Sequence, residues 1–346
     1  MFSVDETGTK VRVDLPIANA RVEEKRGEVY VNVGKTLSPA LRIDGGVNYE
    51  FSNLKVSGDA SAERTLKFLK PNLTIDWKPG AGWHTQFSAR RTVAQLNFYD
   101  FISFGELSIN RVTGSNADLQ PQRAWEFRAT VEHPILGDGL FKLDLGHDRI
   151  SKLQDHILIF DDAGNAFDAP GNLGSATRSF ATLTVDAPLG ILWKGLRAKL
   201  NSTLQRTRVA DPISGRQRQF SGFFPDWQWE IDVRRDAGRF SYGFDLSDRQ
   251  AITFYRTDEF DTNLNRGAYL TAFIEYRLSP KTALTFSADN LLSTHAARDR
   301  LLFFPNRAQT ESSFEEYRDR NRHRSFQITL KQSFGGASAK VAAKSN

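Results

Sequence analysis

Apolar and polar residues alternate one by one along nearly the whole chain, and this period of two constrains the fold more than any other feature. Between Arg123 and Glu132, apolar residues occupy positions 125, 127, 129 and 131. The same pattern recurs in residues 41–51, 240–247, 268–278 and 326–331. Successive side chains of a strand point to opposite faces, so each segment has one apolar and one polar face. No comparable helical period occurs, and the pattern predicts an all-β chain.

The connections between these segments are of two kinds that alternate along the chain. Short, turn-like connections fall at residues 37–39, 79–82, 136–139, 235–238 and 278–281, and longer polar ones at 57–64, 97–120, 159–175, 210–222, 257–265 and 304–321. An antiparallel up-and-down meander with short turns at one end and long loops at the other gives this order, as in outer-membrane barrels. A soluble β-sandwich also alternates apolar and polar residues, but strands of about ten residues favour a tilted membrane crossing.

The spacing of the turns predicts the number of strands. Strands that follow short turns are expected to begin near residues 40, 83, 139, 195, 238 and 282. One hairpin therefore takes roughly 48 residues, and the chain holds about seven hairpins, or about 14 strands. We predict a partial transmembrane antiparallel barrel, smaller than the roughly 22-stranded plugged transporters.

Composition excludes several classes of protein. Cysteine is absent, which excludes a disulfide scaffold, a thiolate metal site and a cysteine nucleophile. The net charge is +5, but basic and acidic residues are interspersed, so we predict no nucleic-acid partner. No run of about 18 apolar residues offers a membrane-spanning helix. The segment after Met1 lacks the apolar core of a signal peptide.

Five segments carry a resemblance to a known family, and one of them, residues 89–101 (ARRTVAQLNFYDF), is similar to the strand end that precedes the next motif. Residues 114–123 read GSNADLQPQR, which resembles the segment "GNPDLKPE" that leads from a long extracellular loop into a strand in that family. Residues 69–79 read LKPNLTIDWKP, residues 286–292 read FSADNLL, and residues 324–334 read RSFQITLKQSF. They are similar to an earlier strand, the penultimate strand and the closing strand with its aromatic end. Together these motifs resemble the TonB-dependent receptors, over roughly residues 10 to 334.

The resemblance implies structural roles for particular residues. The matching positions are Asn116, Asp118, Leu119, Pro121, Asn290, Leu291, Phe326, Leu330 and Phe334. It implies a barrel portion over residues 1–334, followed by a polar tail at 335–346 that we expect to be disordered. It further implies a location in the outer membrane of a Gram-negative bacterium. The expected partners are membrane lipid and lipopolysaccharide, the barrel-assembly machinery, and TonB through a plug domain.

The sequence departs from the family pattern in two ways. We expect neither a plug domain nor a TonB box within these residues, and about eight strands of a complete barrel are absent (22 less about 14). Twelve residues follow Phe334, whereas the closing aromatic residue usually ends the chain in this family. This departure weakens the expectation that Phe334 acts as an assembly signal.

The charged and aromatic residues on the expected strands can each be interpreted in two ways. Glu126, Arg128, Glu132, Glu230, Asp232, Glu275 and Arg277 resemble acid–base pairs, but a wet barrel lumen explains them without further assumption. No G-x-S-x-G elbow or phosphate loop accompanies them, so we predict no enzyme. Trp83, Trp125, Trp193, Trp227 and Trp229 lie near strand ends, where indoles favour the lipid headgroup level; ligand stacking is the alternative.

The sequence gives only weak indications of ligand-binding segments. Seven arginines between Arg298 and Arg324 suit lipopolysaccharide or an anionic ligand, although a solvated loop of mixed charge is the simpler interpretation. Residues 161–168 carry oxygen ligands but lack EF-hand spacing, which favours an ordinary loop over a calcium site. The six histidines show no zinc-binding spacing. We predict no metal site, catalytic residue or cofactor, and the ligand-binding residues stay unknown.

The sequence thus predicts the C-terminal barrel portion of a TonB-dependent receptor that takes up a scarce ligand such as a ferric siderophore. In that family the barrel is the wall, its loops capture ligand, and the plug carries the gate. A passive porin-like diffusion channel and a non-functional truncated remnant remain the alternatives. Ion conductance across a planar bilayer would detect the channel.

Overall fold

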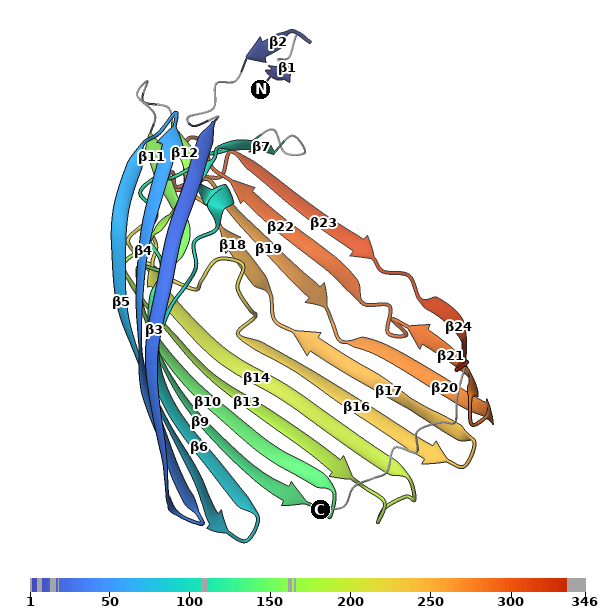
Figure 1. The fold of residues 1–346 in the computed structure, drawn as a ribbon. Coiled ribbons are helices and arrows are strands. Elements are labelled where there is room, and N and C mark those ends of the chain that lie inside the picture. The colour runs from blue at the N-terminus through green and yellow to red at the C-terminus, as the bar shows by residue number, and fades with distance from the viewer. Residues whose placement is uncertain are drawn as a thin grey trace.

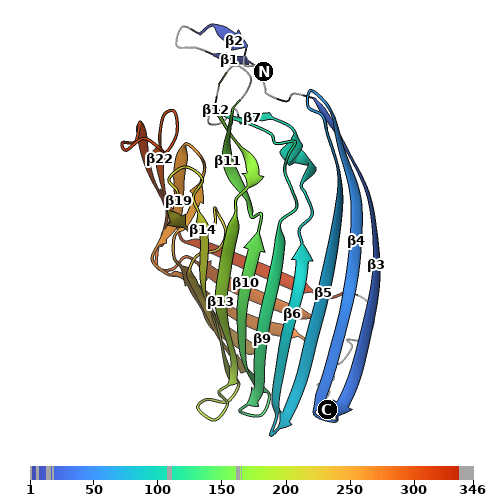
Figure 2. The same cartoon turned by 90° about the vertical axis from the view of Figure 1, so that its left-hand side faces the viewer.

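The computed structural model describes residues 2–4, 8–12, 17, 19–106, 111–160, 164 and 166–334. Its main feature is a large, curved antiparallel sheet that stays open on both sides (Figures 1 and 2). The predicted tail, residues 335–346, lies outside the described residues. No helix among the residues described is long and apolar enough to cross a membrane.

Thirteen strands follow one another across this main sheet in simple chain order, so the fold is an up-and-down meander. They are β3 (Ala20–Ser38), β4 (Leu41–Gly58), β5 (Ala62–Gly80), β6 (Trp83–Val93), β9 (Arg123–Ile135), β10 (Gly139–Ser151), β13 (Ser175–Pro188), β14 (Leu196–Ala210), β16 (Trp227–Ala237), β17 (Phe240–Arg249), β20 (Tyr269–Ser279), β21 (Thr282–Asp289) and β24 (Ser325–Gln332). The two-residue strand β15 (Gln217–Arg218) pairs with β14 as the fourteenth. The predicted fold class is confirmed, the predicted number of strands matches the main sheet, and the strands after short turns begin within two residues of the predicted positions.

Three smaller sheets are built from the segments that join the main strands or precede them. β1 (Phe2–Val4) pairs with β2 (Lys10–Arg12). β7 (Phe104–Glu106), β8 (Arg111–Thr113), β11 (Gln154–Phe160) and β12 (Ala166–Asn172) form a second sheet, and β18 (Ile252–Tyr255), β19 (Glu259–Arg266), β22 (His295–Leu302) and β23 (Phe314–Asn321) form a third. A short 3-10 helix, η1 (Phe98–Phe101), lies between β6 and β7. The predicted long loops are therefore partly strands.

One predicted long loop is wrong. We expected a polar loop at residues 57–64, but β4 runs to Gly58 and β5 begins at Ala62. Gly58 adopts a φ of +121°, which glycine tolerates and which allows the chain to reverse there. Asn19 secures the reversal: its carbonyl accepts from the Asp59 amide, and its own amide donates to the Asp59 carboxylate.

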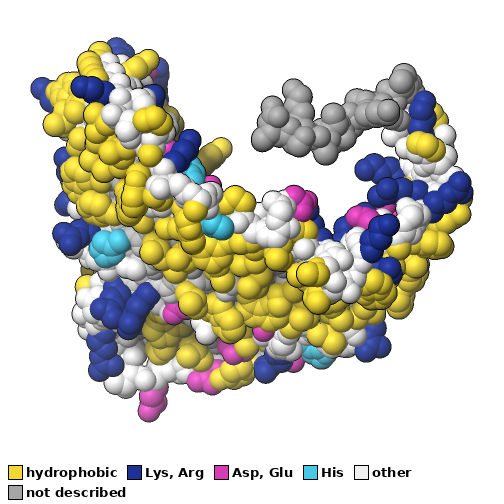
Figure 3. Space-filling model, turned by 90° about the horizontal axis from the view of Figure 1, so that it is seen from below, with side chains coloured by type: hydrophobic (Ala, Val, Ile, Leu, Met, Phe, Trp, Pro, Cys, Tyr) yellow, Lys and Arg dark blue, Asp and Glu magenta, His cyan; other side chains and the backbone are white. Residues whose placement is uncertain are grey.

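Strand register sorts the side chains of the main sheet into two faces. Leu69, Tyr49 and Val29 are cross-strand neighbours on one face, and Lys70, Asn48 and Tyr30 are neighbours on the other. The first face is apolar across the whole sheet, through Phe127, Leu145, Ala181, Leu204, Ile231, Phe244, Ile274, Phe286 and Ile328. Many of these side chains are exposed, and hydrophobic side chains form a broad band in the space-filling view (Figure 3). We call this the outer face and the polar one the inner face.

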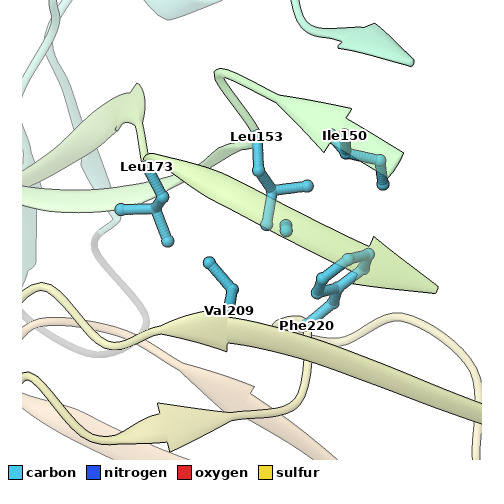
Figure 4. Packing of buried hydrophobic residues seen from close by; sticks show 6 residues of the cluster. Ile150, Leu153, Leu173, Val209 and Phe220 are labelled. Carbon is cyan, nitrogen blue, oxygen red and sulfur yellow. The ribbon is translucent and has the colours of Figure 1, made fainter. Parts of the chain in front are cut away.

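Buried hydrophobic clusters lie near the long-loop end of the inner face. One contains Leu54 and Val56 of β4 with Leu96, Phe101 and Leu119 of the segment that joins β6 to β9. The other contains Ile150, Leu153, Leu173, Ala176, Val209 and Phe220 (Figure 4). Ile150, Ala176 and Val209 are cross-strand neighbours on the main sheet, whereas Phe220 comes from the loop after β14. The loops therefore fold back over the inner face and pack against it.

The main sheet ends in two strands that each lack a neighbour on one side. β3 has 19 residues and β24 has 8, and neither pairs with a further strand in the part of the chain described. All residues of β24 are exposed, including Phe326 at 65% and Ile328 at 73%. An open edge leaves backbone N–H and C=O groups without partners.

Candidate functional site: the inner face and the long-loop end

Ion pairs between neighbouring strands cover the inner face. Lys70 reaches Glu28 at 2.9 Å and Glu50 at 2.7 Å, and Arg26 also pairs with Glu50 at 2.6 Å. Farther along the sheet, Arg128 links Glu126 with Asp148. Glu132, Glu230, Asp232, Glu275 and Arg277 lie on the same face, as the register of their strands requires. The charged residues predicted to line a lumen thus share one concave, polar surface.

The predicted tryptophans lie at the two ends of the outer face. Trp83 begins β6, and Trp193 lies in the turn between β13 and β14, both at the short-turn end. Trp125, Trp227 and Trp229 stand at the opposite ends of β9 and β16. Trp83 contacts His133, and the eight residue steps from Trp125 to His133 span roughly 26 Å along β9. Two aromatic belts therefore bound an apolar band of about the height found in membrane barrels.

The segment GSNADLQPQR anchors its loop to the inner face. Leu119 is completely buried in the cluster with Leu54 and Phe101. The Asn116 side chain accepts a hydrogen bond from the Asp118 amide at 2.8 Å, and the Asn116 carbonyl accepts one from the Leu119 amide at 3.2 Å, which closes a tight turn. The Asp118 side chain stays 94% exposed, and Pro121 is buried.

Asn290 joins three segments at the end of β21. It is 1% exposed and has a φ of +53°, a conformation that asparagine tolerates better than most residues. Its carboxamide donates to the carbonyls of Thr294 and Arg322 and accepts from the Thr294 amide at 2.7 Å. The next residue, Leu291, donates its amide to the Leu270 carbonyl. This residue pair fixes the passage from the main sheet into the third sheet.

The other motif residues lie at the open edge. Phe326 and Leu330 point to the outer face of β24, opposite Ala288 and Leu284 of β21. Phe326 stacks on Phe286 with 6.1 Å between ring centroids. Phe334 follows the strand and is 87% exposed.

A buried ion network, which sequence reasoning missed, ties the long loops together. Asp211, just after β14, accepts from Arg218 at 2.8 Å and from Arg307 of the β22–β23 connection at 2.8 Å. Arg218 also pairs with Asp155 of β11 at 3.0 Å. Burial acts to raise the pKa of Asp211, but the bonds from Arg307, the Ser214 amide and Arg218 hold it far below its usual range. Arg307 is 96 residues from Asp211 in the sequence, so no local pattern reveals the contact.

A second polar contact joins the β11–β12 hairpin to the β18–β19 turn. Asp168 of β12 is buried and lies 2.7 Å from His156, and it accepts from the Thr257 amide at 2.8 Å. Burial acts to lower the pKa of His156, but the hydrogen bond and charge of Asp168 raise it above the usual value. No group of three His, Asp or Glu side chains suited to a metal ion occurs among the described residues. The predicted polar loop at 161–168 is described only at Gly164 and from residue 166 onward.

The third sheet holds a basic cavity of about 480 Å³. Arginines contribute most of its polar wall, and Phe254, Ala296 and Ala297 contribute the apolar part. The arginines are Arg256, Arg298, Arg318, Arg320 and Arg322, with Asp261 as the only lining carboxylate in the part of the chain described. Four of the seven arginines between Arg298 and Arg324 therefore line a single cavity, which the sequence alone did not predict.

We compared the chain with known protein families and solved structures. The sequence profile described as "TonB dependent receptor-like, beta-barrel" matches residues 4–291. No curated protein matches the chain.

Among solved structures, the FrpB iron transporter from Neisseria meningitidis (F3-3 variant) aligns with a TM-score of 0.63 and 11% identity, over 92% of this chain and 46% of that one. The copper transporter OprC aligns at 0.65 and 11%, over 90% and 50%. The ferric yersiniabactin uptake receptor FyuA from Yersinia pestis aligns at 0.62 and 12%, over 91% and 46%. This chain spans about half the length of these structures, and at such low identity the likeness concerns the fold alone.

Proposed function

Because this chain belongs to the TonB-dependent receptor β-barrel family, we propose that it forms the C-terminal barrel portion of an outer-membrane transporter. Members of this family are receptors and transporters of the outer membrane of Gram-negative bacteria rather than enzymes. The proposed activity is uptake of a scarce ligand, such as a ferric siderophore. The barrel portion comprises residues 1–334.

The observation that carries the proposal is the two-faced main sheet. An apolar outer face between two tryptophan belts suits a hydrocarbon layer, because aromatic side chains favour the two interfaces. The inner face offers charges and hydrogen-bond partners to water or to a polar ligand. The loops pack over this face at the long-loop end, and in this proposal they capture the ligand there.

The remaining partners follow from the mechanism of the family. The outer face contacts lipid and the lipid part of lipopolysaccharide, and insertion requires the barrel-assembly machinery. The energy for transport of the ligand is supplied through TonB, which acts on a plug domain. In this proposal the strands here provide the wall and the capturing loops, and the plug provides the gate.

Uptake of radioactive iron tests the proposal. Cells that make this protein in its natural setting are compared with cells that lack it, using iron loaded on a catecholate and on a hydroxamate siderophore. We expect uptake of at least one complex to require both the protein and TonB. Uptake that is equal with and without the protein contradicts the proposal for these ligands. Uptake that persists without TonB indicates a passive channel instead.

A further inference from the structure

The basic cavity of the third sheet brings together arginines from separate segments. Register places Arg298 of β22 directly opposite Arg318 of β23 and Asn263 of β19. Arg320 lies opposite Ala296, two residues farther along the same face. Arg256 comes from the β18–β19 turn, and Arg322 follows β23. Like charges directly opposite each other on a sheet destabilise it, so this arrangement carries an energetic cost.

Carboxylates compensate only part of this charge. Asp261 binds Arg298 with two hydrogen bonds of 2.8 and 2.6 Å, and Glu316 binds Arg318 at 2.5 Å. Arg320 and Arg322 form no ion pair with any residue that the structure describes, and both are exposed. Two guanidinium groups at the cavity thus keep donors available, and an anion there would relieve the repulsion among the arginines.

The face of the third sheet that carries the cavity is connected with the inner face of the main sheet through β19. Asn263 and Asn265 lie on the same face of β19, and Asn265 also lines a hollow with Asn201, Glu230 and Ser247 of the main sheet. These three residues belong to the inner face. The polar surface is therefore continuous from the main sheet to the arginines. A solute that enters the concave side reaches them, whereas the outer face is apolar and suits lipid.

We propose that this cavity binds a soluble, multiply charged oxyanion, whose phosphate, carboxylate or catecholate oxygens accept from Arg298, Arg318, Arg320 and Arg322. Guanidinium groups recognise such oxygens in bidentate geometry, which adds direction to the attraction between charges. Phe254, which is 41% exposed, supplies an apolar wall beside the charges. That the bound anion is also the transported ligand rests on the proposed function, but the binding site itself does not.

Binding of inorganic pyrophosphate tests the site. Radiolabelled pyrophosphate is equilibrated with outer-membrane vesicles that contain the full chain as cells make it, and with vesicles that lack it. The Arg320→Gln/Arg322→Gln variant removes two exposed charges without breaking any ion pair among the described residues. We expect it to bind about tenfold more weakly, because each charge-assisted hydrogen bond contributes substantially to affinity. The control Arg216→Gln/Arg239→Gln removes the same net charge at exposed positions outside the cavity and should bind as the unchanged protein does.

Three results would overturn the proposal: no saturable pyrophosphate binding, equal binding by the Arg320/Arg322 variant, or an equal loss in the control. In a competition assay, lipopolysaccharide micelles are added to the vesicles, and pyrophosphate binding is measured again to identify the source of the anion. If the site binds only the lipopolysaccharide of those micelles, the assignment to a soluble ligand is overturned. The assay needs neither TonB nor uptake, so saturable binding without transport would refute the proposed transport function and leave the anion site standing.

Discussion

At the scale of single residues, Asn290 shows how one side chain fixes a junction between sheets. Its carboxamide serves three backbone groups from two segments, and its backbone adopts a left-handed conformation. A substitution therefore removes hydrogen bonds, introduces backbone strain, or does both. These two effects can be separated by the choice of the new residue.

We predict that Asn290→Gly lowers the free energy of unfolding by about 2 kcal/mol, because buried carbonyl and amide groups lose their partners. Asn290→Ala should cost about 1 kcal/mol more, since alanine is strained at positive φ and glycine is not. Urea unfolding followed by tryptophan fluorescence gives both values. Gln309→Ala, at an exposed position in the β22–β23 connection, is the control. A glycine variant as stable as the unchanged protein would contradict the role given to the carboxamide.

Asp211 gives a prediction about pH. Its folded-state pKa is depressed by Arg307, Ser214 and Arg218, so its contribution to stability is complete above the unfolded pKa of about 3.9 and declines as pH falls toward the folded value. Asp211→Asn should lower the free energy of unfolding by about 3 kcal/mol near neutral pH, because buried Arg307 loses its carboxylate and buried Arg218 keeps only that of Asp155. The deficit should be constant between about pH 6 and 8 and shrink below about pH 4.

Urea unfolding over that pH range checks the expectation, with Asp118→Asn at a fully exposed carboxylate as the matched control. A deficit that stays unchanged into the acid range would mean that the carboxylate's charge does not hold the loops together.

At the scale of elements, Leu119 is one of the buried residues that hold the loop after β6 against the main sheet. Leu119 fills the cluster with Leu54, Val56 and Phe101, while its neighbour Asp118 points to solvent. We predict that Leu119→Ala lowers the free energy of unfolding by about 3 kcal/mol through the cavity it leaves. Asp118→Ala should change it by less than about 1 kcal/mol. Limited proteolysis within residues 94–122 gives an independent readout. Equal cleavage of the two variants would show that Leu119 does not anchor the loop.

The main strands were predictable because the alternation of apolar and polar residues is a local property of the sequence. Residues 125–132 show the pattern without interruption, and β9 covers them. The inserted strands escaped prediction, since β19 and β23 carry polar residues on both faces and resemble loops in sequence. The Asp211–Arg307 pair and the arginine cavity escaped because each joins residues that only the folded loops bring together. The roles of the motif residues, including Phe326 and Phe334, remain predictions.

At the scale of the whole molecule, the two faces of the main sheet must meet different surroundings if the proposed location is correct. Leu200 lies on the outer face of β14, and Asn201, the next residue, lies on the inner face opposite Glu230. We predict that Leu200→Lys destabilises the folded protein in lipid by about 2–4 kcal/mol and reduces the amount of protein found in the outer membrane.

Asn201→Lys should be tolerated, because the new ammonium group faces Glu230 and water. Quantifying each variant in separated inner-membrane, outer-membrane and soluble fractions checks both expectations. Equal loss of the two variants, or no effect of Leu200→Lys, would argue against an outer face in contact with lipid.

The two sides of the wall around the long-loop end differ in how far the strands of the main sheet continue. β3, β4 and β5 continue as unbroken strands of 18 or 19 residues, whereas on the opposite side the hydrogen-bonded ladder stops and a separate four-stranded sheet carries on (Figure 1). The first side is one continuous sheet, whereas the second consists of two sheets that meet at Asn290 and Thr294. The arginine cavity lies in the separate four-stranded sheet, so an anion bound there would contact strands that are not hydrogen-bonded into the main sheet.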